Sequence, residues 1–337
     1  MTTTPAGGSP GRRSILAAAA TGLVGLAAPR IGAAQAPTWT PTQPVRIVIG
    51  FVPGGMTDAS ARVLAPHFTQ WLGQPVVVDN RAGAGGNIGT EQVVRAAPDG
   101  HTLLLAHAGQ IVVNPHTFPG LRLDTLRDLA PIGLMRSGVF ALVVHPSLGV
   151  NSVQELVALL KRNPGKYNYA TTAPGGQAHV ITEIFKQRTG VDIEGVHFRG
   201  SGQATTEVLT GRVPITFEVV PVMLQHMRSG GVKPLMVAAD ARSGVIPDVP
   251  TAAEAGLPDF TFLNWFALFA PRGTPQAIID RYAELTRRAL ALPDVAERIR
   301  AEGDEPGDGS PQRLAELVAR EHRIVGEVVR AQNIRAE

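Results

Sequence analysis

Two short apolar segments, each followed by a glycine-rich turn and a helix-forming stretch, constrain the fold of this chain most strongly. They are RIVIGFVPGGMTDASARVL at residues 46–64 and QPVVVDNRAGAGGNIGTEQVV at residues 74–94. Each turn places the amino terminus of a helix at the end of a sheet, with unpaired N–H groups and about half a positive charge. Such a terminus binds a small anion without lysine or arginine. The sequence therefore raises the question of whether the anion is a cofactor phosphate or a free carboxylate.

Residues 1–36 have the layout of an export signal. Arg12 and Arg13 precede an apolar stretch at residues 15–28, and small residues follow as far as Ala36. The stretch is shorter than the ~20 residues that a membrane span needs, which disfavours a permanent anchor. The paired arginines leave both the general and the twin-arginine route open, and cleavage after Ala34 competes with cleavage after Ala36. We predict a periplasmic protein whose leader is removed.

The charge balance of the mature chain excludes several classes of partner. The leader contains three arginines and no acid, so its removal lowers 31 basic residues to 28, against 28 acidic residues. A neutral chain without a cluster of basic residues does not favour nucleic acid or an anionic membrane as partner. The chain has no cysteine, which excludes disulfides, zinc-thiolate sites and a thiol nucleophile. About 300 mature residues suffice for two domains with cores.

The rest of the chain alternates short apolar strands with helices. Because the apolar runs lack polar alternation, they predict parallel strands covered on both faces in an α/β sandwich. A second unit begins after the strand at residues 140–144, and a long helix at residues 311–331 indicates that the chain returns to the first unit. Further strands are expected at residues 45–52, 76–79, 101–106, 167–171, 195–198, 213–218, 234–238 and 262–269, and further helices at 58–72, 89–97, 152–161, 177–188, 203–209, 221–227, 275–291 and 293–301.

Four separated segments identify a family resemblance when they are taken together. They are PGGMTDASAR, NRAGAGGNIGTEQVVRAAPDGHTLLLA, PDVPTAAEAGLPDF and WFALFAPRGTP. Because these segments occur in this order after an export signal, the chain resembles the solute-binding receptors of tripartite tricarboxylate transporters, also called the Bug family. The resemblance extends from about Gln43 to the C-terminus.

The resemblance implies a fold and a function. The fold is an α/β periplasmic binding protein, type II-like, with two lobes that are each a sheet flanked by helices, and with two crossing segments as the hinge. Lobe 1 would comprise residues 40–140 and 265–337, and lobe 2 residues 141–264. The protein would close on a small carboxylate and deliver it to the permease subunits of a tripartite tricarboxylate transporter. It would be a monomer that does not itself span the membrane.

The first glycine turn supplies the candidate site residues of lobe 1. Gly54, Gly55 and Thr57 match the family loop whose backbone amides and hydroxyl face the ligand. Asp58 matches as well, but its carboxylate would repel an anionic solute, so a helix-capping role is the preferred interpretation. Gln110 belongs to a segment expected to form another wall of the cleft, with a plain turn as an equal alternative.

The loop TTAPGGQAH supplies the candidates of lobe 2. Backbone N–H groups of Gly175, Gly176 and Gln177, together with the side-chain amide of Gln177, are expected to hold the carboxylate, directly or through water. Ala173 is a further candidate in this loop. The family usually has serine or threonine at the position of Gly176 and glycine at that of Ala173, so a hydroxyl is missing here. His179 is expected to pack or cap rather than to bind.

Phe198, Ser201 and Glu218 complete the candidate site. Phe198 stands where the family commonly has tyrosine, so its ring can cover a ligand but lacks the hydroxyl group. Arg199 stands where lysine is common and is expected to be a solvated surface charge. Glu218 stands where aspartate is usual and faces either the cleft or the hinge. In the cleft it would receive the ammonium group of an amino-acid ligand. The ligand therefore stays open among di- and tricarboxylates, acidic amino acids and aromatic acids.

Enzyme functions find little support in the motifs. The loop GAGGNIG has the spacing GxGxxxG rather than GxGxxG and no downstream Tyr-x-x-x-Lys pair, which disfavours a dinucleotide-dependent oxidoreductase. Its expected task is close packing of a helix on a strand. The Gly-x-Ser-x-Gly at residues 7–11 lies in the leader, and the nine histidines show no metal-ligand spacing. We predict no catalytic residue, metal or cofactor; a receptor that serves a sensor kinase remains the alternative.

Overall fold

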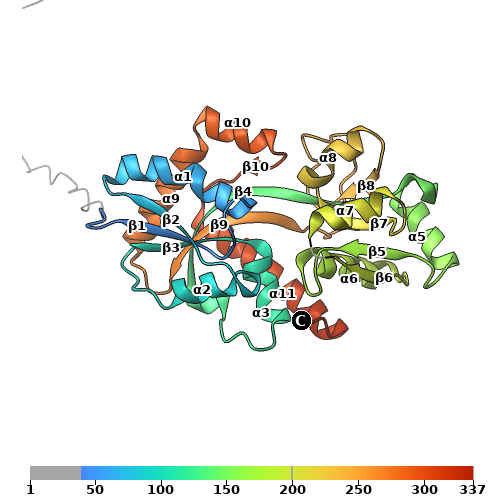
Figure 1. Cartoon of the computed structure of the whole chain (residues 1–337), viewed down its shortest axis with the longest axis horizontal. Coiled ribbons are helices and arrows are strands. Elements are labelled where there is room, and N and C mark those ends of the chain that lie inside the picture. The colour runs from blue at the N-terminus through green and yellow to red at the C-terminus, as the bar shows by residue number, and fades with distance from the viewer. Residues whose placement is uncertain (1–38, 199, 337) are drawn as a thin grey trace, which may run out of the picture. The chain divides into compact units, whose positions relative to one another are not determined.

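The computed structural model describes residues 39–198 and 200–336, so the expected export leader and Arg199 lie outside the described residues. The described chain is an α/β structure built on one mixed sheet with the strand order β2-β1-β3-β9-β4-β7-β5-β6, to which β8 and β10 add by pairing with β4. Figure 1 shows helices on both faces of this sheet. We describe it in two halves, lobe 1 and lobe 2, which share β4.

Lobe 1 combines the first third of the chain with its last quarter. Its strands are β1 (Val45–Ile49), β2 (Val76–Asn80), β3 (Thr102–His107), the first part of β4 (Leu129–Val144), β9 (Leu263–Pro271) and β10 (Glu305–Pro306). Its helices and helical turns are α1 (Met56–Leu72), η1 (Ala84–Gly86), α2 (Asn87–Val94), η2 (Gly109–Val113), α3 (Asn114–Thr117), α4 (Thr125–Asp128), α9 (Gln276–Leu290), α10 (Pro293–Ala301) and α11 (Pro311–Gln332).

Lobe 2 is formed by the middle of the chain. Its strands are the end of β4, β5 (Asn168–Thr171), β6 (Glu194–His197), β7 (Ile215–Val219) and β8 (Lys233–Val237). Its helices and turn are η3 (Pro146–Leu148), α5 (Val153–Arg162), α6 (Gln177–Thr189), α7 (Ser201–Leu209) and α8 (Val220–Arg228). The lobe limits expected from the family resemblance stay a prediction.

The strand β4 is continuous through both lobes and is much longer than the expected strand at residues 140–144. Residues 129–139 pair antiparallel with β9, and residues 140–144 pair with β7 and β8. Pro131, Gly133 and the buried Arg136 interrupt the apolar pattern of its first part, and the register shifts beside them. Arg136 is accommodated because its Nε bonds the buried Asp304 at 2.7 Å. Because these residues interrupt the apolar pattern, the sequence did not predict the first part of β4.

The expectation of parallel strands throughout is wrong for the two strands that join the lobes. The neighbours β1, β2 and β3 are parallel, and so are β5, β6 and β7. In contrast, β9 lies antiparallel to both β3 and β4. A strand that returns from lobe 2 enters the lobe 1 sheet from the opposite end, so its direction is reversed there.

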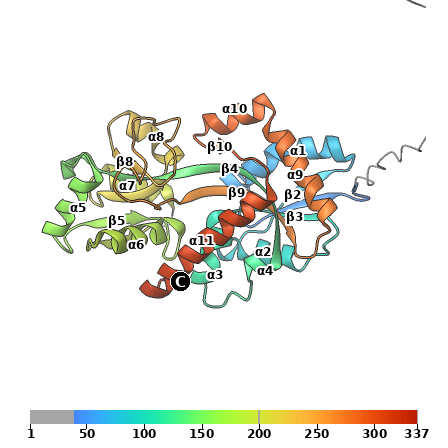
Figure 2. The same ribbon diagram turned by 180° about the vertical axis from the view of Figure 1, so that it is seen from behind.

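The core forms on both faces of the sheet. On one face of lobe 1, α1 and α9 pack on residues such as Ile47, Leu103 and Phe266. On the other face, α11 covers Trp265 and Phe269 and belongs to a cluster that continues into lobe 2. Figure 2 shows α11 running across this face toward α6. The three aromatic residues of β9, Trp265, Phe266 and Phe269, belong to this core, since each is at most 3% exposed.

The loop GAGGNIG packs α2 closely on the end of β1, as predicted. A Cβ on Gly50 would lie 2.5 Å from the Cα of Gly86, and a Cβ on Gly89 would lie 2.9 Å from the Cα of Gly50. Because side chains cannot fit between these backbones, glycine is required at both sides of the contact.

Within residues 39–198 and 200–336, none of the helices combines the length and the apolar character that a bilayer crossing demands.

Candidate functional site

A cavity of about 430 Å³ lies where the strand ends of lobe 1 face those of lobe 2. The strands that join the lobes contribute Phe140 and Asn264, and Ala336 approaches from beyond α11. Lobe 1 contributes Phe51, Gly85, His107, Gly109, Val113, Asn114 and Phe118, and lobe 2 contributes residues 172–178, Ser201, Glu218 and Val219. A volume of this size is in the range of small-molecule sites.

The structure brings together only part of the residue set expected from the sequence. The residues that line the cavity are Ala173, Gly175, Gly176, Gln177, Ser201 and Glu218. The residues that lie outside its lining are Gly54, Gly55, Thr57, Asp58, Gln110 and Phe198. Ligand contact by either group of residues stays a prediction.

The first glycine turn is held together by its own aspartate. The Asp58 carboxylate accepts hydrogen bonds from the Gly54 N–H at 3.0 Å, from Arg62 Nε at 2.8 Å and from Asn80 Nδ2 at 3.1 Å. These donors lower the pKa of Asp58 to about 2, with the Arg62 hydrogen bond as the largest cause. Asp58 therefore has a structural role, as the sequence favoured, but it holds the turn in front of α1 through Gly54 rather than capping the N-cap residue Gly55.

Gln110 and Phe198 do not line the cavity and have partners within their own lobes. The Gln110 amide donates to the Gly86 carbonyl at 3.0 Å and to Thr90 Oγ1, so it ties the end of β3 to α2. Its neighbour Gly109 lines the cavity instead. Phe198 packs against the core of lobe 2, and its N–H donates to the Thr171 carbonyl at 2.9 Å.

The amino terminus of α6 forms the lobe 2 wall of the cavity. Gly176 is its N-cap and offers no side-chain cap, and the first intrahelical bond is that of Val180 N–H to the Gly176 carbonyl. The N–H groups of Gln177 and Ala178 therefore have no partner within the helix. Since α6 is 13 residues long, its dipole adds positive potential at this wall.

His179 takes the packing role expected for it. Its Nδ1 accepts the N–H of Gly175 at 2.9 Å, which fixes the turn before α6. Gln177 donates its side-chain amide to the Leu263 carbonyl at 2.8 Å and so connects α6 to the start of β9.

His107 is a neutral hydrogen-bonding group on the lobe 1 wall. Burial lowers its pKa to about 4, and its Nδ1 accepts the Gly109 N–H at 3.0 Å. A neutral imidazole that accepts at Nδ1 carries its proton on Nε2. His107 therefore keeps one donor for another partner.

Glu218 brings a carboxyl group to the lobe 2 side of the cavity. It is 6% exposed, and its Oε1 accepts the Val219 N–H at 2.9 Å. Burial raises its pKa, while the hydrogen bonds from Val219 and Ser201 act in the opposite direction. The sequence left open whether Glu218 faces the cleft or the hinge. In the structure, Glu218 is part of the cavity lining.

Several residues of the lining were not anticipated from the sequence. Phe51 and His107 stand at the carboxyl ends of β1 and β3, where ligands of open α/β sheets bind, and this rule would have found them. Asn114 and Phe118 come from the unpredicted segment η2–α3. Ala336 approaches only through the tertiary fold, where its N–H donates to the Thr117 carbonyl at 2.8 Å.

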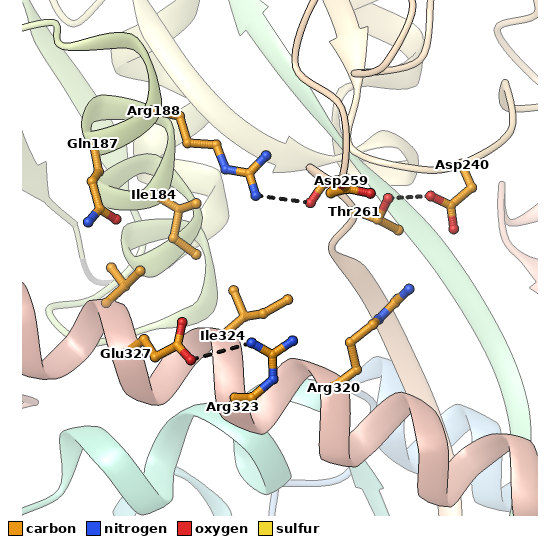
Figure 3. Close-up of a pocket in the computed structure, with 11 residues that line it drawn as sticks. Ile184, Gln187, Arg188, Asp240, Asp259, Thr261, Arg320, Arg323, Ile324 and Glu327 are labelled. Carbon is orange, nitrogen blue, oxygen red and sulfur yellow. Dashed lines mark hydrogen bonds and ion pairs between the residues drawn. The ribbon is translucent and has the colours of Figure 1, made fainter.

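A second hollow, of about 450 Å³, lies between α6, α11 and the segment before β9. Figure 3 shows that its charged side chains face one another, with Arg323 bonded to Glu327 at 3.4 Å and Arg188 to the Asp259 carbonyl at 3.3 Å. It has neither a glycine turn nor the amino terminus of a helix. The chemistry of an anion site therefore favours the cavity between the strand ends.

Solved structures share this architecture. MatC from Rhodopseudomonas palustris, solved with bound malate, is 33% identical, with a TM-score of 0.71 over 86% of this chain and 99% of that one. Rpa4515 from R. palustris, solved with adipate, is 32% identical, with a TM-score of 0.73 over 88% of this chain and 99% of that one. The fold and the cavity define a periplasmic solute-binding protein, which confirms the predicted fold class.

The family follows from the sequence comparisons. Residues 60–334 match the tripartite tricarboxylate transporter family receptors. Protein BugT from Bordetella pertussis strain Tohama I is 39% identical over 291 residues, which are 86% of this chain and 89% of BugT. The chain belongs to the tripartite tricarboxylate transporter receptor family, as its motifs indicated. This family and its fold are those of solute-binding receptors and not of enzymes.

Proposed function

We propose that this chain is an exported receptor that captures a small organic carboxylate in the cavity between its lobes and delivers it to a tripartite tricarboxylate-type permease. The observation that carries the proposal is the cavity wall formed by the uncapped amino terminus of α6. Helix N–H groups at a cavity of this size favour a small anion as ligand. The predicted leader at residues 1–36 supports a periplasmic location.

The charge of the cavity wall supports binding through neutral donors. Among the described residues that line the cavity, none is a lysine or an arginine. The donors available there are the α6 N–H groups, the Nε2–H of His107 and the side chains of Thr172 and Asn264. Hydrogen bonds to an ionised group are about twice as strong as neutral ones, so such a wall can hold a carboxylate.

The first glycine turn would reach the ligand when the two lobes close. Gly54, Gly55 and Thr57 lie at the amino terminus of α1, outside the present cavity lining. A hinge at β4 and β9 would bring this terminus toward lobe 2, so that both helix termini meet the ligand. The closed form would then be the one that the permease recognises.

The lobe 2 groups around the ligand would be of two kinds. Gln177 would bind through its free backbone N–H group, and Ala173, Gly175 and Gly176 would shape the turn in front of it, because the N–H groups of Gly175 and Gly176 already donate to His179 Nδ1 and to the Ala173 carbonyl. Ser201 and Glu218 would supply side-chain contacts. Phe198 and Gln110 keep a supporting role, because their contacts lie within their own lobes.

Binding is tested first with protein that lacks residues 1–36. Thermal unfolding is followed with a panel of dicarboxylates, tricarboxylates, amino acids and aromatic acids, and positive compounds are measured by calorimetry. A ligand at 100 times its Kd stabilises by about 2.7 kcal/mol, which gives a readily measured shift. If no carboxylate stabilises the protein while an unrelated class of compound does, the proposal is wrong.

Variants locate the site. Gly176→Val should weaken binding at least tenfold, because its Cβ would already lie 3.3 Å from the Ala173 carbonyl and its methyl groups would cover the α6 terminus. Thr57→Ala should cost about fivefold, as expected for one hydrogen bond of about 1 kcal/mol. Thr210→Ala is the matched control on an exposed threonine. A large loss in Arg199→Ala alone would contradict binding through neutral donors.

Delivery to a permease needs a separate measurement. Cells that lack the gene should lose uptake of the carboxylate identified by calorimetry, and the wild-type gene should restore it. The Gly176→Val gene should restore uptake poorly, although the protein reaches the same level. Normal uptake without the receptor would show that it serves another task, such as sensing.

A further inference from the structure

The carboxyl group of Glu218 is unusual in a cavity that favours anions. It stands at the end of β7, is 6% exposed and belongs to the lining of the cavity. Its hydrogen-bond partners are the Val219 N–H, at 2.9 Å, and the side chain of Ser201. Both partners are uncharged, so neither neutralises the carboxylate.

The surroundings of Glu218 supply no compensating charge in the described part of the chain. The other titratable side chain of the cavity lining, His107, is neutral because burial lowers its pKa to about 4. On α6, His179 is neutral for the same reason, and Lys186 is bonded to Glu183 at 2.8 Å. In β4, the residue opposite Glu218 is Ala141.

A bound carboxylate would therefore share a small, largely buried space with Glu218. Two ionised carboxyl groups in one such site repel each other, and the usual result is that one of them keeps a proton. The alternative is a ligand that carries its own ammonium group. Malate and adipate, which occupy the related structures, have no such group.

Resting on the proposed function, we propose that Glu218 takes up one proton when the cavity binds a carboxylate, and that its O–H then donates a hydrogen bond to the ligand. The proton comes from the solvent and adds to one carboxylate oxygen of Glu218, so one O–H bond forms and the net charge of the protein rises by one. The other oxygen keeps the N–H of Val219. The ligand is thereby selected as an anion without an ammonium group.

Calorimetry measures this proton directly. Titration of malate, adipate and the best compound of the panel is carried out at pH 7 in buffers with different ionisation enthalpies, so that the slope gives the protons taken up. We expect close to one proton per ligand. Between pH 6.5 and 8.5, where the ligand carboxyl groups stay ionised, Kd should rise up to tenfold per pH unit.

Two glutamate variants test whether the proton taken up on binding goes to Glu218 or to another titratable group. Glu218→Gln should bind without proton uptake and with a Kd that does not change over this pH range, since the amide replaces the O–H as donor. Glu183→Gln is the matched control, because Glu183 is a buried carboxylate of the same lobe outside the cavity lining. It should retain both the uptake and the pH dependence.

Other results would overturn the inference. One is a dicarboxylate that binds the wild type with no proton exchange and with constant Kd. Another is binding restricted to amino carboxylates that tightens as pH rises and is lost in Glu218→Gln, which would make Glu218 an ammonium site. A third is proton uptake that begins only in Arg199→Ala, because Arg199 would then be the missing countercharge. If no carboxylate binds at any pH, the proposed function itself fails.

Discussion

Replacing Gly89 with alanine should destabilise the protein, although alanine is the better helix former. Gly89 lies in the first turn of α2, and a Cβ there would lie 2.9 Å from the Cα and 3.0 Å from the N of Gly50. Carbon atoms in favourable contact are ~3.5–4 Å apart. Since both contacted atoms are backbone, α2 would have to move away from β1 by roughly half an ångström or more.

The expected magnitude follows from two opposing terms. Alanine gains about 1 kcal/mol over glycine inside a helix. Overpacking against atoms that cannot rotate away costs about 1–3 kcal/mol, or more, and the backbone contact places Gly89 at the upper end. The net loss should be about 2 kcal/mol, which corresponds to a fall in Tm of roughly 4–8 °C by the scaling for domains of 150–250 residues.

Gly202→Ala is the matched control. Gly202 also lies in a helix, α7, but nothing lies within 4 Å of its added Cβ. The same substitution should therefore raise stability there by up to about 1 kcal/mol. Urea unfolding followed by tryptophan fluorescence compares both variants with the wild type. If Gly89→Ala is as stable as the wild type, or if both variants shift the midpoint in the same direction, the packing argument is wrong.

Two further substitutions test side chains whose roles are set by burial and hydrogen bonding. Asp58→Ala should cost about 2 kcal/mol in urea unfolding, because it leaves the Gly54 N–H without its acceptor, whereas the exposed partner Arg62→Ala should cost much less; equal losses would contradict this. Glu321 is buried beside Trp265, and burial raises its pKa from 4.5 to about 7. The folded state therefore holds this proton more tightly than the unfolded state does. As pH rises from 4.5 to 7, the free energy of unfolding should fall by about 3 kcal/mol. Glu321→Gln should remove this slope and keep the Trp265 hydrogen bond, while the exposed control Glu316→Gln should retain it.

Local patterns predicted most of the regular elements. The amphipathic stretch behind Ser152 became α5 with Ser152 as its N-cap, and the final helix runs from Pro311 to Gln332, one residue beyond the expected end. The misses have a common cause, which is tertiary compensation. Arg136 breaks the apolar pattern of β4 and is tolerated there because Asp304 and Glu302, far along the chain, form ion pairs with its guanidinium.

The candidate site was predictable to the extent that it follows strand ends. Gly176 and Gln177 were expected at a helix terminus beside a ligand, and the structure places both at the cavity. The sequence could not show that Gly85, from the loop assigned to packing, also reaches the cavity lining. That contact depends on the unpredicted α3, since Asn114 Nδ2 bonds the Gly85 carbonyl at 2.9 Å.

Backbone donors and side-chain groups of the cavity would contribute differently to ligand specificity. In the proposed site, backbone N–H groups of α6 would bind a carboxylate whatever the rest of the ligand contains, so they could not by themselves choose among acids. In the described lining, the choice would fall to polar side chains, above all Glu218 and His107. His107 can only donate at its free nitrogen, whereas Glu218 donates or accepts according to its protonation. A proton on Glu218 would therefore decide whether the same cavity accepts a simple dicarboxylate or demands a ligand with a cationic group.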